Sequence, residues 1–121
     1  MHRDELERAI AWSAVYNPRW DSDPDAYVAA GICPWGRTRR LGKLLLPATG
    51  FKAYLGVQHV DPRQAAWNSL DAPEARFFVS WFAGTRCLGL RVAPTMAAAR
   101  DLLWAAWEQR QRIGAAGGVR P

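Results

Sequence analysis

The sequence predicts one α+β domain: a small antiparallel sheet of three strands, or at most four, packed on a long C-terminal helix, with one or two N-terminal helices. Three observations support this class. The chain has 121 residues, a usual length for one domain. Residues that favour strands gather in three runs after residue 50. An alanine-rich segment of helical periodicity follows these runs.

The N-terminal region, residues 1–50, is predicted to hold two helices and a basic loop. Residues 3–16 have the apolar spacing of an amphipathic helix, which Asn17-Pro18 ends. Asp23-Pro24 is typical of a helix start, and Gly31 of a helix end. Residues 31–50 are expected to be irregular apart from a short strand at Leu44–Leu46.

The C-terminal region, residues 51–113, is predicted to hold the sheet and the long helix. The expected elements, in order, are a strand over 51–60, a connection over 62–74 with one helical turn at 64–69, strands over 75–82 and 86–92, and a helix over 96–113. The short link with Gly84 predicts a hairpin, and Thr95 is the expected N-cap of the helix. Residues 1–113 therefore form the expected domain, and 114–121 a flexible tail.

Positive charge is concentrated in the middle of the chain. The net charge is +5, and residues 31–60 hold five cationic side chains and no acid. A basic segment of this kind favours a polyanion or an acidic protein surface as partner.

Composition also argues against several classes of protein. Two cysteines do not make the disulfide framework of a small secreted domain. The N-terminus lacks the apolar core of a signal peptide, and no apolar run reaches the ~18 residues that cross a bilayer. We therefore expect a cytoplasmic protein without a membrane partner. Two histidines and no phosphate-binding or nucleophile motif predict a non-enzymatic protein without cofactor or metal.

The loop around Trp35 is the first feature that indicates binding. An indole followed closely by arginines can stack on a base or sugar while the guanidinium groups contact phosphates. Alternatively, Trp35 fills the core and the arginines are a solvated loop. The side chains expected to contact nucleic acid are Trp35, Arg37, Arg39, Arg40, Lys43, Lys52, Arg76, Arg86 and Arg91.

The order of elements after residue 49 is the second feature. The relevant motifs are Thr49-Gly50-Phe51-Lys52, Leu55-Gly56-Val57, an aromatic strand ending at Gly84, Leu88-Gly89, and Thr95 before an alanine-rich helix with Ala98 and Ala99. With these motifs, residues 49–112 resemble the integrase-type or Apetala-type DNA-binding domain. The resemblance implies a three-stranded sheet on one helix, with the sheet lying in the major groove of duplex DNA.

Aromatic residues support a second hypothesis. In strand 76–82, Phe77, Val79 and Trp81 alternate with Phe78 and Phe82, so both faces are largely apolar. Either the N-terminal 50 residues cover the second face, or it binds a protein.

Two functions are therefore expected from the sequence. The first is a small DNA-binding regulator from a bacterial or phage mobile element. The second is a protein-binding inhibitor or assembly subunit of phage or plasmid type, acting through tryptophan and arginine. Trp104 and Trp107, three residues apart on the last helix, would support a homodimer.

Overall fold

The computed structural model describes residues 1–60 and 74–118. Its α+β class is the predicted one. The elements are helix α1 (Arg3–Arg8), strand β1 (Ala11–Trp12), 3-10 helix η1 (Pro18–Trp20), helix α2 (Pro24–Ala29), strands β2 (Thr38–Leu46), β3 (Phe51–His59), β4 (Ala75–Ala83) and β5 (Arg86–Ala93), and helix α4 (Met96–Gly118).

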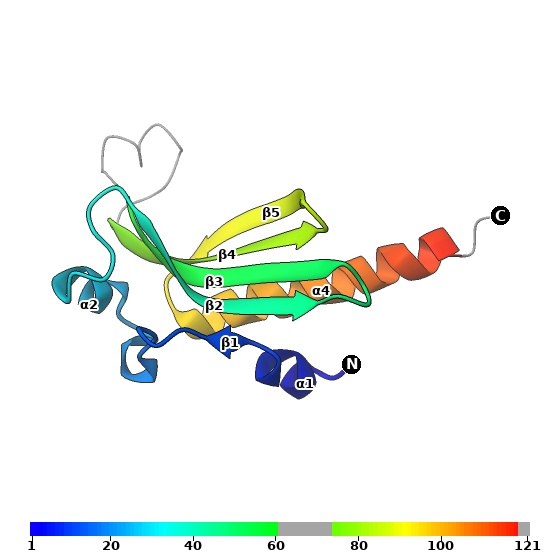
Figure 1. The fold of residues 1–121 in the computed structure, drawn as a ribbon, viewed down its shortest axis with the longest axis horizontal. Coiled ribbons are helices and arrows are strands. Elements are labelled where there is room, and N and C mark those ends of the chain that lie inside the picture. The colour runs from blue at the N-terminus through cyan, green and yellow to red at the C-terminus, as the bar shows by residue number, and fades with distance from the viewer. Residues whose placement is uncertain (61–73, 119–121) are drawn as a thin grey trace.

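The sheet is an antiparallel meander of five strands that follow one another in chain order, β1-β2-β3-β4-β5. The expectation of three or four strands was therefore too low. The additional pairing comes from segments predicted as helix and loop. Helix α4 packs against one side of the sheet, behind the strands in the view of Figure 1.

The predicted helix over residues 3–16 was wrong in its second half. Helix α1 ends at Arg8, and the chain then joins the edge of the sheet, where Ala11 pairs with Lys43 and Trp12 with Gly42. The indole of Trp12 lies directly over Gly42, since a Cβ added to Gly42 would be only 2.8 Å from Trp12 Cε3. Strand pairing and this close contact override a local helical pattern.

The predicted basic loop was also wrong, because its second half is a strand. Strand β2 begins at Thr38 and pairs with β3 along its whole length, from Thr38 opposite Gln58 to Leu46 opposite Phe51. The register shifts between Arg40 and Gly42, so Leu41 is the extra residue of a β-bulge. The backbone groups that a loop would expose are thereby paired.

Several local predictions are confirmed. Helix α2 begins at Pro24, and Gly31 has a φ of 74° just beyond its end. Gly84 has a φ of 61° in the β4–β5 hairpin. The Oγ1 of Thr95 accepts a hydrogen bond from the Ala98 N–H at 3.1 Å. Helix α4 continues to Gly118, beyond the predicted end at 113, whereas the turn predicted at 64–69 and the tail residues 119–121 lie outside the described residues.

The core lies between the sheet and the helices. Phe77 of β4 meets the ring of Tyr27 from α2 edge to face, with 6.2 Å between centroids. Phe51 of β3 meets Trp107 of α4 in the same manner at 5.2 Å. Burial raises the pKa of the Tyr27 hydroxyl above its ordinary value, so this phenol stays neutral in the core. None of the described helices combines the length and the apolar character that a bilayer crossing requires.

Candidate nucleic-acid interface

One face of the sheet has no helix on it among the described elements. Helices α2 and α4 pack against β3 and β4 on the side of Phe77, and Figure 1 looks at the opposite side. Alternation along the paired strands gives the side chains of this second side, which we call the open face. They are Thr38, Arg40, Lys43 and Leu45 of β2, Lys52, Tyr54 and Gln58 of β3, Arg76, Phe78, Ser80 and Phe82 of β4, and Cys87, Leu90 and Val92 of β5.

The β-bulge at Leu41 brings Arg40 and Lys43 onto this face together. Residues three apart in a regular strand point to opposite faces. Here Leu41 turns into the core and is fully buried, while Arg40 is opposite Gly56 and Lys43 opposite Tyr54. Arg40 and Lys43 consequently share the open face with Lys52 and Arg76.

The other predicted arginines do not join this group. Arg39 is opposite Val57, Arg91 is opposite Val79, and Arg86 is opposite Ala83 in the ladder. These positions alternate with those of the open face, so their side chains start from the helix side of the sheet. Arg37 precedes β2, and its carbonyl accepts a hydrogen bond from the His59 N–H at 2.9 Å.

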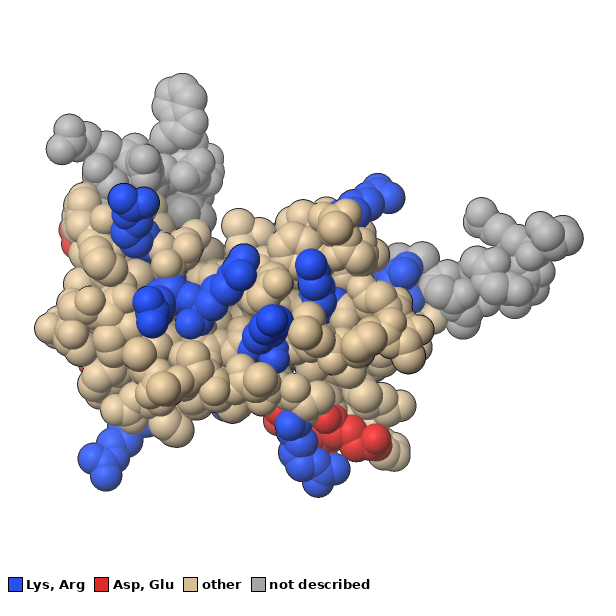
Figure 2. Space-filling view, in the orientation of Figure 1, with Lys and Arg blue, Asp and Glu red and all other residues tan. Residues whose placement is uncertain are grey.

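Charge on strands β2 to β5 is entirely positive. They carry seven cationic side chains and no carboxylate, namely Arg39, Arg40, Lys43, Lys52, Arg76, Arg86 and Arg91. Ion pairs among the described residues join Arg3 and Arg100 to Glu7, Asp21 and Asp101, away from the open face. In Figure 2, Lys and Arg stand across the middle of this face, and acids show only at its margin.

Aromatic rings hold two of these cations in place. The guanidinium carbon of Arg40 lies 3.8 Å from the ring centroid of Tyr54, and the ammonium of Lys52 lies 5.5 Å from that of Phe82. The rings of Tyr54 and Phe82 meet edge to face at 5.7 Å. A cation over a ring keeps its outer N–H groups available, so Arg40 and Lys52 remain donors for an anion.

Trp35 lies beside the sheet rather than within the core. Its side chain is 48% exposed, and its ring meets that of His59 edge to face at 4.5 Å. The alternative in which Trp35 fills the core was therefore wrong. The indole is accessible near the end of β3, and Arg37 follows it by two residues in the chain.

The sequence did not identify Tyr54, Leu90 and Val92 as parts of this surface. The alternation in β4 did indicate that Phe78 and Phe82 share a face with Arg76. Which residues of β3 and β5 stand beside them depends on the register, and the ladder is shifted at Leu41 in β2 and again beside Phe82 in β4.

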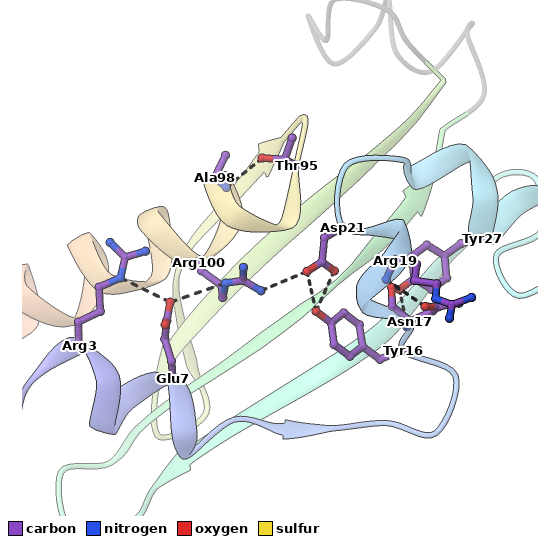
Figure 3. A network of polar contacts seen from close by, with 10 residues as sticks. All are labelled: Arg3, Glu7, Tyr16, Asn17, Arg19, Asp21, Tyr27, Thr95, Ala98 and Arg100. Carbon is purple, nitrogen blue, oxygen red and sulfur yellow. Dashed lines mark hydrogen bonds and ion pairs between the residues drawn. The ribbon is translucent and has the colours of Figure 1, made fainter.

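A second cluster of charges, between α1, η1 and α4, is paired internally. Figure 3 shows Glu7 between Arg3 and Arg100, and Asp21 between Arg100 and Tyr16. Arg3, Glu7 and Arg100 border an open groove of about 630 Å³ that the stacked rings of Trp12 and Tyr16 also line. The hydrogen bond from Arg3 to Asp101 raises the pKa of Arg3, and each charge has an opposite neighbour. The cluster therefore fastens the N-terminal segment to α4.

Histidine, cysteine and carboxylate side chains form no group of three that would hold a metal ion within the described ranges. Comparison of the chain with protein-family models, curated proteins and solved structures gives no match.

Proposed function

We propose that this protein binds DNA through the open face of its sheet, without catalysing a reaction. The observation that carries the proposal is the charge of this face: Arg40, Lys43, Lys52 and Arg76 stand together, and none pairs with a carboxylate among the described residues. Phosphate groups are the anions that such a surface neutralises, with release of condensed counterions.

The arrangement also supports a contact with the backbone rather than a recognition of particular bases. Guanidinium and ammonium groups that contact phosphates position a protein on nucleic acid but carry no sequence information directly. A regulator with this surface would therefore bind DNA with a strong dependence on salt.

Two double variants test the proposal. Arg40→Gln with Lys43→Gln removes two positive charges from the open face, and Arg39→Gln with Arg91→Gln removes two from the other side of the sheet. At constant salt, fluorescence anisotropy with labelled DNA should give an affinity about tenfold lower or more for the first variant only. The first variant should also lower the salt slope by about one per lost contact. Equal losses in both variants would show that total charge, and not this face, determines binding.

A protein partner is the second candidate, and the edge of the sheet favours it. Strand β5 is the last strand, and its Leu88 and Leu90 are 41% and 55% exposed. Unpaired edge strands with exposed apolar side chains bind other strands. If the protein acts in this way, Leu88→Lys with Leu90→Lys would abolish association with the partner, and the Arg40 and Lys43 variant would leave it intact.

A further inference from the structure

A boundary parallel to the strands, between β3 and β4, divides most of the open face into a cationic half and an apolar half. Rows of the ladder run Leu45–Lys52–Phe82, Lys43–Tyr54–Ser80–Leu90 and Arg40–Gly56–Phe78–Val92. In these three rows the cations stand on β2 and β3, and the side chains on β4 and β5 are uncharged and mostly apolar. Leu45 of β2 is the apolar exception in the first row, and the fourth cation, Arg76 of β4, stands in the next row, opposite Gln58. The aromatic contact between Tyr54 and Phe82 spans the boundary between β3 and β4.

We infer that the DNA bound here is single-stranded, an inference that rests on the proposed function. A single strand has charged phosphates along one edge and unpaired bases along the other, and the faces of those bases are apolar. A duplex conceals the base faces and offers phosphates on both sides of each groove. The division of the open face fits the single strand, because an apolar half would remain unused against a duplex backbone.

The spacing of the cations indicates the axis along which the bound DNA runs. Arg40, Lys43 and Lys52 occupy three successive rows on β2 and β3. Successive rows are separated by two residues, which is about 7 Å along a strand. A polynucleotide backbone parallel to β2 would meet one cation per row, while its bases lie over the neighbouring strands.

The apolar half offers both rigid rings and accessible surface. Phe78 is buried across Gly56, where its Cε1 would lie 2.6 Å from an added Cβ, so it supports the exposed side chains from within. Phe82 and Val92 are half-buried, and Leu90 is 55% exposed. Bases that stack on or cover such side chains gain affinity without regard to their identity, because each base has an apolar face.

The test compares single-stranded and duplex DNA on the full chain. Labelled oligo-dT of about 12 nucleotides and a duplex of equal length are titrated at one salt concentration, with fluorescence anisotropy as the readout. We expect the single strand to bind about tenfold more tightly than the duplex. Leu90→Ser should weaken binding of the single strand about tenfold and leave binding of the duplex unchanged. Phe82→Ser also removes the ring beside Lys52, so it should weaken binding of the single strand about tenfold more than binding of the duplex.

Leu45→Ser is the matched control, since Leu45 is an exposed apolar side chain of the open face but lies on the far side of Lys52 from Phe82. It should alter neither affinity. Because Leu90 is largely exposed, Leu90→Ser keeps the test informative should Phe82→Ser fail to fold.

Each contrary result has a separate meaning. Duplex binding as tight as that of the single strand would overturn this inference and leave DNA binding in place. An affinity for the single strand that neither Phe82→Ser nor Leu90→Ser changes would overturn it as well. Absence of binding to either DNA would refute the proposed function itself. If oligo-rU binds as tightly as oligo-dT, the protein contacts the phosphates and base faces that RNA and DNA have in common, as the inference requires. Binding of oligo-rU alone would exclude DNA as the ligand.

Discussion

Arg100 of α4 holds Asp21 at the end of η1, with 3.5 Å between Arg100 Nη1 and Asp21 Oδ2. The same carboxylate accepts a hydrogen bond from the Tyr16 hydroxyl at 2.7 Å, and the Asp21 carbonyl accepts one from the Met96 N–H at 2.7 Å. Asp21 therefore joins the irregular N-terminal segment to the beginning of α4 (Figure 3).

Replacement of this carboxylate should destabilise the domain. Asp21→Ala removes the acceptor of Tyr16 and the ion pair with Arg100, and hydrogen bonds to charged groups contribute about 1.5–3 kcal/mol. We expect a decrease of about 2 kcal/mol in the free energy of unfolding, measured by urea denaturation. Asp23→Asn is the control, because Asp23 is exposed, makes no side-chain capping bond, and should change stability by less than about 0.5 kcal/mol.

Alkaline pH should weaken the same connection. Burial first, and then the hydrogen bond to Asp21, raise the pKa of Tyr16 above its ordinary value near 10. The folded state thus keeps a proton that the unfolded state loses above about pH 10, so stability is full below that pH and falls as the pH rises further.

Denaturation midpoints measured from about pH 8 to about pH 11 should show this loss, and Tyr16→Phe should make it shallower. Tyr27, whose pKa is also raised by burial, keeps part of the pH dependence in that variant. An unchanged slope in Tyr16→Phe would assign the alkaline loss to other groups.

Trp104 and Trp107 should behave differently although they are three residues apart. Trp107 is 5% exposed and packs on Phe51, whereas Trp104 is only partly buried. Trp107→Ala should therefore cost about 3–5 kcal/mol of stability, and Trp104→Ala clearly less. Sedimentation of the Trp104→Ala variant tests the dimer predicted from the sequence, because Trp104 is the more exposed of the two indoles.

Gly56 should tolerate no side chain. A Cβ at this position would lie 2.2 Å from the Arg39 carbonyl oxygen and 2.6 Å from Phe78 Cε1. Because one of these atoms belongs to the backbone, Gly56→Ala should destabilise the protein by about 1–3 kcal/mol in chemical denaturation. Ser80→Ala, on the same face of the neighbouring strand, should stay within about 0.5 kcal/mol of the parent.

The sequence predicted those elements whose signals are local. The second helix, the β4–β5 hairpin and the N-cap Thr95 depend on residues next to one another in the chain, and all three are confirmed. Strand β1 and the first part of β2 were missed because they depend on partners elsewhere, whereas the short strand expected at Leu44–Leu46 is the end of β2. Ala11–Trp12 is extended only because it pairs with Gly42 and Lys43, and the arginines of β2 gave no apolar alternation to indicate a strand.

The candidate interface was predicted by composition but not by geometry. The basic segment and the aromatic strand were evident, and Arg40, Lys43, Lys52 and Arg76 do share one face. Arg40 and Lys43 lie on the same face as Tyr54 because Leu41 is an extra residue in β2. Nothing in the periodicity of the sequence indicates the position of this bulge. Arg39, Arg86 and Arg91 have the same composition signal but alternate to the other side.

The separation of charge between sheet and helices has a consequence for encounter. Every described acid lies outside β2 to β5, on or beside α1, η1, α2 and α4 or at Glu74 before β4. The strands thus carry uncompensated positive charge, whereas arginines accompany the acids elsewhere, so the field of a polyanion favours orientations in which the strands face it. The protein would thus meet the polyanion with its sheet facing it more often than at random. This increase in the association rate disappears at salt concentrations where the Debye length is shorter than the width of the domain.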